Sequence, residues 1–488
     1  MAFALTPRER GWLALAFAAV VGVRLATLGA YPLMDPTEAR YAEIARKMLE
    51  TGDWVMLQFD YGIPFWGKPP LSTWLSAAAM AAFGANEFAA RLPSLLLLAG
   101  CGVLVHRLAA LRGGRDQSLW TLLPFAATGL VFVAAGAVMT DPALVLGTTL
   151  SMAGFWLAVN GPERRAGGAM FFLGLALGLL AKGPVAAVLS FVPIVAWTLW
   201  TRRWREVWRA LPWLTGALAT AALVAPWYWA AERASPGFLD YFLVGEHWKR
   251  FVEPGWKGDL YGAAHARPRG IIWLFWIAAA LPWSLPALGW LARAAFARRN
   301  DARRLVMDPW LAYLTLWVVT PMLFFTVSGN VLATYVLPGL PAFALLLGEL
   351  WRPAAGDPRT LRPAVRVVVA LALMLPLVVV VGIVTQRHRF DHELSHRALV
   401  ELYAARRNSP AERLVYVGQR PVSAEFYARG KAVKVDDAAA LAPYLGDANA
   451  DFFVFRAKDL PALPAATRAR LAPLGEFGEY RLFRELPR

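Results

Sequence analysis

Long apolar runs recur along almost the whole of this 488-residue chain, and they restrict it to folds that cross a membrane. A helix needs about 17–25 mainly apolar residues to span the hydrocarbon layer of a bilayer. Runs of this kind predict about eleven spans, at residues 11–30, 88–111, 119–138, 141–160, 167–182, 184–200, 210–230, 270–292, 309–328, 331–351 and 363–385. A shorter apolar stretch, residues 70–84, predicts an interfacial or re-entrant helix. The expected fold class is therefore an all-α polytopic membrane protein, with about 11–13 transmembrane helices.

The composition argues against a soluble protein. Hydrophobic residues make up 58% of the chain and charged residues 17%, too few to cover a soluble surface of this size. The 50 Lys and Arg outnumber the 34 Asp and Glu, which gives a net charge of +16. This excess is typical of cytoplasmic loops, and it lacks the clustering that nucleic-acid binding requires, so no nucleic-acid partner is expected. Cys101 is the single cysteine, which excludes a disulfide within the chain, and no cleavable signal peptide is predicted.

Basic residues gather in alternate connections between the predicted spans. Tracts such as RLAALRGGRDQ, GPERRAGG and TRRWREVWR are rich in arginine, whereas the turns between them carry little charge. The positive-inside rule then places the N-terminus in the cytoplasm. It places two long loops, residues 31–69 and 231–269, and everything after residue 386 on the opposite side of the membrane.

The chain divides into a membrane domain, residues 1–386, and a soluble periplasmic domain, residues 387–488. In the second domain, strand-like runs such as RLVYVG and DFFVFRAKDL alternate with helical stretches, which predicts a small α/β fold with about four strands. His388, His392 and His396 are spaced four residues apart there. They could share a helix face and bind zinc, but an ordinary solvated helix is the favoured interpretation, because the HExxH order is absent.

The first long loop begins with an amphipathic pattern over residues 35–50, which predicts a helix on the membrane surface. Its polar side carries charged residues at helical spacing: Arg40, Glu43, Arg46, Lys47 and Glu50. Asp35, Pro36 and Glu38 could form a capping box at the start of this helix. Alternatively, Asp35 or Glu38 faces a cavity as a general base or ligand. Local spacing leaves both interpretations open.

Lys68 stands before two prolines, which hold the chain extended and keep this lysine near the bilayer surface. It either contacts a lipid phosphate or serves as a fixed cation for the phosphate of a bound molecule. Asp141 and Lys182 end two other spans on the same predicted side, where an ionisable residue indicates a functional site. For Asp141 a helix cap is the structural alternative.

The second long loop concentrates charge beside aromatic residues. Glu246, His247, Lys249 and Arg250 lie in the string GEHWKRF, on the same predicted side as Lys68. Tyr335 follows in SGNVLATYVLP, about one turn inside a span, where its hydroxyl needs a partner.

These strings resemble a known family. YPLMDPTEARYAEIARKMLETGDW, FWGKPPLSTWL and NEFAARLPS, followed by LAKGPVA, GEHWKRF, LPWSLP and SGNVLATYVLP, are similar in type and order to the lipid A aminoarabinose transferases and related family 39 glycosyltransferases. The resemblance covers most of residues 20–345. It implies a C-type glycosyltransferase fold, an active site on the periplasmic side of a catalytic membrane domain, and a sugar donor carried on polyprenyl phosphate.

The resemblance also implies roles for particular residues. The catalytic candidates are Asp35, Glu38 and Asp141, where Thr37-Glu38 replaces the adjacent Asp-Glu pair that is common in the family. The candidates for substrate binding are Arg40, Tyr41, Lys68, Lys182, Glu246, His247, Arg250 and Tyr335. No cofactor is expected with certainty. A divalent metal on His247 is doubtful, because Gly67 stands where some relatives have a metal-linked glutamate.

The expected reaction moves a sugar from undecaprenyl phosphate to lipid A or another envelope acceptor, with inversion at the anomeric carbon. The acceptor could instead be a hydroxyl on a protein or glycan, for which a base becomes essential. The expected partners are the donor, the acceptor and membrane lipids, and the protein is expected to be a monomer. A polytopic transporter is the alternative from another class, but no internal repeat supports it.

Overall fold

The computed structural model describes residues 4–296, 305–351, 358–445 and 449–486. Within these ranges, seven helical segments are long and apolar enough to cross a membrane, and one bent pair would make an eighth. The seven are α4 (Glu87–Ala126), α6 (Asp141–Asn160), α7 (Arg164–Lys182), α10 (Trp213–Ala234), α15 (Pro309–Thr326), η2 with α16 (Ala333–Gly339 and Leu340–Leu350) and α17 (Pro358–Thr385). The helical bundle agrees with the predicted fold class.

The predicted spans correspond to helices of several kinds. Predicted span 88–111 lies on the 40-residue helix α4, which is interrupted by the non-helical Gly113 and Gly114. Predicted span 119–138 covers the end of α4 and the short helix α5 (Gly129–Ala134). Three other predicted spans correspond to a short helix, a bent pair and a helix with a charged first turn: α8 (Val185–Thr201), α12 with α13 (Ile271–Ala279 and Ser284–Phe296, at 115°) and α1 (Pro7–Ala26). The count of about eleven spans stays a prediction.

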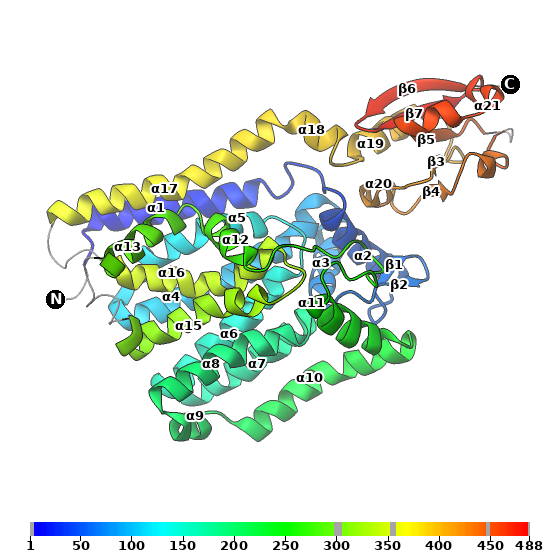
Figure 1. The fold of residues 1–488 in the computed structure, drawn as a ribbon. Helices are drawn as coiled ribbons and strands as arrows, with labels where there is room; N and C mark the ends of the chain where they lie inside the picture. The colour runs from blue at the N-terminus through cyan, green and yellow to red at the C-terminus, as the bar shows by residue number, and fades with distance from the viewer. Residues whose placement is uncertain (1–3, 297–304, 352–357, 446–448, 487–488) are drawn as a thin grey trace.

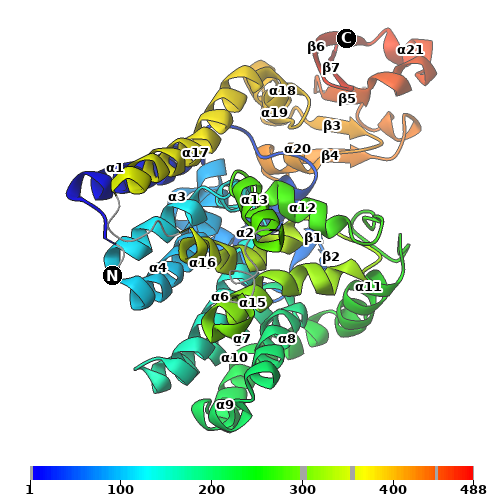
Figure 2. The ribbon, with the colours of Figure 1, turned by 60° about the vertical axis from the view of Figure 1, so that its left-hand side comes forward.

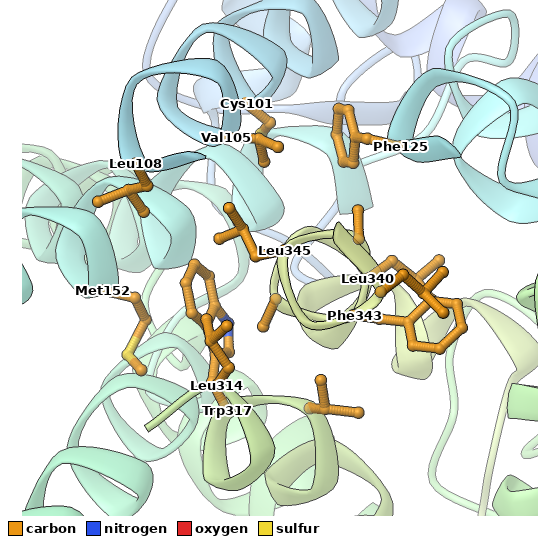
Figure 3. Packing of buried hydrophobic residues seen from close by; sticks show 14 of the residues in the cluster. Cys101, Val105, Leu108, Phe125, Met152, Leu314, Trp317, Leu340, Phe343 and Leu345 are labelled. Carbon is orange, nitrogen blue, oxygen red and sulfur yellow. The ribbon is translucent and has the colours of Figure 1, made fainter. Parts of the chain in front are cut away.

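The core of the bundle lies where α4, α6, α15 and α16 meet (Figure 3). The side chains that fill it are buried and apolar: Cys101 and Val105 from α4, Met152 from α6, Leu314 and Trp317 from α15, and Phe343 and Leu345 from α16. Because lipid tails are as apolar as these side chains, close van der Waals packing between the helices is what holds them together.

Helices α6 and α7 pack unusually closely, because glycines line their contact. A Cβ atom on Gly147 would lie 2.6 Å from the backbone nitrogen of Gly178, and one on Gly154 would lie 2.5 Å from that of Phe171. Small residues let two membrane helices approach to backbone contact. Since α6 begins at Asp141 and α7 ends at Lys182, this packing brings those two charges side by side.

The first loop and the C-terminal domain lie at one end of the bundle (Figure 1). The loop holds α2 (Thr37–Thr51), the hairpin β1–β2 (Gln58–Asp60 and Ile63–Pro64) and α3 (Leu71–Phe83), which matches the predicted short helix. Helix α17 lies beside α1 in both views and leads through α18 (Arg387–His392) into the C-terminal domain (Figures 1 and 2). The other short helices are α9 (Trp204–Ala210), η1 (Asp240–Lys249) and α11 (Arg250–Val252).

The C-terminal domain contains five strands in its described residues, one more than predicted. Their order across the sheet is β4–β3–β5–β7–β6, with β3 parallel to both of its neighbours and β7 antiparallel to both of its own. The strands are β3 (Leu414–Val417), β4 (Ala432–Val435), β5 (Phe452–Arg456), β6 (Leu471–Phe477) and β7 (Tyr480–Glu485). The helices are α19 (Arg397–Arg406), α20 (Val422–Tyr427), α21 (Ala465–Arg468), η3 (Ala439–Leu441) and η4 (Ala457–Ala462).

The predicted surface helix is corrected by the structure. The side chains of Glu43 and Lys47, on the expected solvated face of α2, have no exposed surface. This face of α2 packs against α20 of the C-terminal domain, where Glu425 pairs with Lys47 at 2.7 Å. The alternation of charge along α2 therefore reflects ion pairing with another domain.

The three histidines of the C-terminal domain do not form a metal site. The rings of His388 and His392 stack at 4.3 Å, whereas His396 is buried with its Nδ1 3.0 Å from the hydroxyl of Tyr416. Burial lowers the pKa of His396 to about 4, so its ring is neutral. His396 is thus part of the domain core, which the spacing of the histidines did not show.

Candidate active site

A cavity of about 470 Å³ opens at the end of the bundle where α6 begins and α7 ends. We call it the polar cavity. Seven of the residues singled out in the sequence line it: Lys68, Asp141, Lys182, Glu246, His247, Arg250 and Tyr335. Apolar side chains from α8, α15 and η1 complete its wall, including Val188, Phe325 and Leu243. A mostly apolar pocket with a few convergent charged groups is typical of a ligand site.

One side of the polar cavity is built around Glu246. Its Oε2 lies 3.0 Å from Nζ of Lys68, and its Oε1 lies 3.0 Å from Nη1 of Arg250. Arg250 also pairs with Asp259 at 3.2 Å. Burial by itself raises the pKa of Glu246, but the charges of Lys68 and Arg250 outweigh it and hold the pKa below its usual value. Glu246 is therefore ionised and joins two cations that would otherwise repel each other.

A second ion pair in the cavity wall joins Lys182 to Asp141, Nζ to Oδ1 at 2.6 Å. The ammonium of Lys182 also lies 5.0 Å from the ring centre of Tyr335, a cation–π distance. Gly183 ends α7 with φ +73°, and a Cβ atom there would lie 2.7 Å from the ring of Phe242. Glycine is thus required at this position for α7 to end beside the cavity.

The geometry of His247 does not fit a metal ligand. Its Nδ1 lies 2.7 Å from the carbonyl oxygen of Phe242, and its Nε2 lies 3.0 Å from that of Lys182. A ligating histidine needs one ring nitrogen directed at open space, and here both face backbone oxygens. The described part of the chain also holds no group of three or more His, Cys, Asp or Glu arranged for a metal. The divalent metal considered from the sequence therefore has no built site here.

The acids of the first loop lie outside the polar cavity. The carboxylate of Asp35 accepts hydrogen bonds from the backbone nitrogen of Ser423, at 2.9 Å, and from the Ser423 hydroxyl. Burial raises the pKa of Asp35, although the bonds from Ser423 oppose this. The predicted capping box is absent, because α2 begins at Thr37 after Pro36 with no side-chain cap. Asp35 instead links the loop to the C-terminal domain.

Glu38 is bound by a single arginine. Nε and Nη2 of Arg91, in α4, donate to its two oxygens at 2.7 and 2.8 Å. The backbone nitrogen of Val138 donates to Glu38 as well, at 3.2 Å. The expectation that Asp35 or Glu38 faces the cavity is therefore not met, since both have structural partners. A catalytic role for either acid stays a prediction.

Arg40 and Tyr41 also lie outside the cavity wall. Arg40 lies over the ring of Phe59 at 5.8 Å, and its buried Nε has no hydrogen-bond partner. Tyr41 packs edge-on against Phe65 at 6.0 Å, close enough to Lys68 to affect its charge. Both residues support the segment that leads to Lys68.

Sequence reasoning missed two residues of the site. Asn330 donates from Nδ2 to the carbonyl oxygens of Arg250 and Glu253, at 2.6 and 2.7 Å, and accepts from the backbone of Gly255 at 2.9 Å. It therefore fixes the loop that carries Arg250. The string SGNVLATYVLP already contained Asn330, so the sequence offered a signal for this residue. Asp259 had no such signal, because its pairing with Arg250 depends on how the loop folds, which no local sequence pattern encodes.

Comparison with known proteins shows which proteins this chain is similar to. Residues 12–242 match the family described as dolichyl-phosphate-mannose-protein mannosyltransferase (PMT). The chain is 34% identical over 388 residues to undecaprenyl phosphate-alpha-4-amino-4-deoxy-L-arabinose arabinosyl transferase 2 of Pseudomonas fluorescens (strain Pf0-1), covering 77% of this chain and 66% of that protein. It is 34% identical over 341 residues to the corresponding transferase of Pseudomonas paraeruginosa (strain DSM 24068 / PA7), covering 67% and 57%. The chain thus spans about 55 to 66% of the length of the curated relatives it matches.

Solved structures show the same fold. ArnT from Cupriavidus metallidurans bound to undecaprenyl phosphate superposes with a TM-score of 0.78 at 20% identity, covering 98% of both chains. The oligosaccharyltransferase AglB from Archaeoglobus fulgidus superposes with a TM-score of 0.50 at 13% identity, covering 93% of this chain and 70% of AglB. These structures show the fold, and the sequence matches support the PMT-related family 39 of C-type glycosyltransferases, which the motifs had indicated.

Proposed function

We propose that this protein transfers a sugar from undecaprenyl phosphate to lipid A or another anionic acceptor of the bacterial envelope. The observation that carries the proposal is the polar cavity, where Lys68, Lys182 and Arg250 converge with the hydroxyl-bearing Tyr335. The names of the curated relatives, which act on an undecaprenyl phosphate-linked aminosugar, supply the donor class.

The cavity suits the departure of a phosphate. In the reaction, an acceptor oxygen attacks the anomeric carbon and the bond from that carbon to the phosphate oxygen breaks, which leaves undecaprenyl phosphate with one more negative charge. Fixed cations directed at the place where charge develops lower the barrier to such a step. Lys68, Arg250 and Lys182, which all line the cavity, supply these cations. One displacement of this kind inverts the anomeric centre.

The acids of the cavity favour an anionic acceptor. Glu246 is held by two cations and has a lowered pKa, and Asp141 is paired with Lys182. Glu246 is therefore a weak base and Asp141 is engaged by an ammonium, whereas a hydroxyl acceptor on a protein or glycan would need a base that is free to act. A phosphate of lipid A is already ionised and needs only to be positioned.

The active site is proposed to face the periplasm. The protein is a multi-pass inner-membrane protein, and its arginine-rich connections favour a cytoplasmic N-terminus. Contacts from Asp35 and Lys47 to α20 put the first loop and the C-terminal domain on the same side of the membrane. Both would then be periplasmic, together with the polar cavity.

The test is transfer by purified protein from a polyprenyl phosphate-linked sugar. Lys68→Met is expected to lower transfer by about 10²-fold or more, because the leaving phosphate loses a buried cation. Lys257→Met, which changes an exposed lysine of the second loop, is the matched control and keeps normal transfer. Normal transfer by Lys68→Met would overturn the phosphate site. Translocation of the lipid-linked sugar without a new glycosidic product would favour the transporter instead. A missing sugar mass on lipid A from a deletion strain identifies the acceptor.

A further inference from the structure

A buried network of charged side chains joins the C-terminal domain to the first loop. Its members, which we call the docking network, come from α2, the hairpin and the region around α20: Glu43, Arg46, Lys47, Asp60, Arg420 and Glu425. Lys47 is at its centre, fully buried, 2.7 Å from Glu425 and 3.6 Å from Asp60. Arg420 binds the same two acids from the other side, at 3.0 and 3.1 Å.

Burying this many charges is unfavourable unless they are paired, and apolar contacts would join two domains at lower cost. What a paired network adds is a unique arrangement, since each donor has its acceptor in only one relative position of the two parts. The C-terminal domain and the hairpin also approach each other closely, because a Cβ atom on Gly430 would lie 2.2 Å from the hydroxyl of Tyr61. The docking network therefore fixes the tip of the hairpin in one place.

The hairpin leads directly to the phosphate-binding lysine. Seven residues separate Asp60 from Lys68, and the segment that leads from the hairpin to Lys68 is anchored at both ends. Its far end is held by Tyr261, whose hydroxyl donates to the carbonyl of Pro64 at 2.8 Å and accepts from the backbone nitrogen of Trp66 at 2.9 Å. Its near end depends on Lys47, whose ammonium donates to the carbonyl of Phe59 at 2.9 Å.

We infer that the C-terminal domain positions Lys68: Glu425 and Arg420 fix Lys47 and Asp60, these fix the hairpin, and the hairpin places the ammonium of Lys68 at the polar cavity. Glu425 and Arg420 are thus positioning residues for donor binding, although none of the described residues of their domain lines the cavity. The inference rests on the proposed role of Lys68 with the donor phosphate.

The test compares Glu425→Gln with Glu412→Gln. Glu412 is also buried and ion-paired, with Arg484 at 3.0 Å, and its partners lie within the C-terminal domain. Glu425→Gln is expected to raise the KM for an undecaprenyl phosphate-linked sugar by about five- to tenfold, with kcat within about twofold, as a charge-assisted hydrogen bond loses its geometry. The Glu412→Gln control keeps both constants.

Hydrogen exchange supplies a readout that does not depend on activity. The amides of residues 58–66 are expected to exchange faster in Glu425→Gln, and those of β5 to keep their protection, which shows that the domain is still folded. Arg420→Lys keeps the charge and should preserve protection of the hairpin, whereas Arg420→Met should lose it. If Glu425→Gln unfolds the domain, Asp60→Asn is the alternative variant, because it removes the ion pairs with Lys47 and Arg420 from the hairpin side. The same rise in KM is expected.

An unchanged KM in Glu425→Gln and Asp60→Asn, with or without faster exchange of the hairpin, would overturn the positioning role. Failure of the proposed function looks different, because Lys68→Met would then transfer normally. In that case the exchange measurement still decides whether the C-terminal domain orders the hairpin.

Discussion

The pair formed by Glu38 and Arg91 offers the sharpest test of whether a motif acid is catalytic or structural. Arg91 has no exposed surface and donates five hydrogen bonds, two to Glu38 and three to the carbonyls of Leu28, Tyr31 and Pro32. Those carbonyls belong to the segment that joins α1 to the first loop. Arg91 therefore holds the start of the loop against α4, and Glu38 neutralises it.

The perturbation is Glu38→Ala, with Glu38→Gln as the milder change. Removing one partner of a buried ion pair leaves the other charge uncompensated and typically costs about 3–5 kcal/mol. Because three carbonyls still accept from Arg91, we expect the low end, about 3 kcal/mol, for Glu38→Ala. Glu38→Gln keeps one oxygen acceptor and should cost about 2 kcal/mol. Arg91→Met should cause a similar loss, and adding it to Glu38→Gln should cost less than the sum of the two.

The assay is thermal unfolding of the purified protein in detergent, with transfer measured per folded molecule. A structural Glu38 predicts a lower Tm for both variants and a transfer rate within about threefold of the original for the molecules that remain folded. The reasoning is refuted if Glu38→Gln unfolds at the original temperature and yet loses transfer by about 10²-fold or more, the size of effect that removal of a general base produces.

Three further predictions concern single side chains. Because burial lowers the pKa of His396 to about 4, the unfolded chain binds a proton below about pH 6.5 that the folded domain does not, so stability is present above that pH and is lost as the pH falls toward 4. Hydrogen exchange of β3 at pH 7 and pH 5 should show this loss, and His396→Gln should reduce it. Arg250→Lys should lower transfer by about tenfold, since a lysine cannot contact Glu246 and Asp259 together as the guanidinium does; equal rates would contradict this. Chelation of divalent metals should leave transfer unchanged, because both nitrogens of His247 face backbone carbonyls, and a chelator-sensitive enzyme restored by added metal would show this geometry to be wrong.

Much of the polar cavity could be predicted from sequence, for a physical reason. Charged residues at the ends of apolar helices are constrained by the bilayer to a common depth, so Asp141, Lys182 and Lys68 were expected on one side before any packing was known. That these residues converge on one cavity could not be predicted in the same way. It depends on the close packing of α6 against α7 and on the turn of η1, which brings Glu246 and Arg250 together. Neither feature has a local signature, and apolar length likewise does not reveal a bend such as that between α12 and α13.

The charges of α2 show where sequence reasoning ends and why. Pairs such as Glu43 with Lys47, four residues apart, stabilise a solvated helix, and the same pattern serves a helix buried against another charged surface. The two cases differ only in the partner, and here the partner, Glu425, lies more than 370 residues further along the chain. An amphipathic pattern therefore shows that a helix has two faces, but it does not show that the polar face meets water. The same limit applies to the motif acids, because Asp35 and Glu38 keep the position expected of catalytic groups while their carboxylates bind Ser423 and Arg91. For a chain of this kind, the charged groups that converge on the polar cavity are the better guide to the site, since an apolar pocket with a few convergent charges is typical of a ligand site.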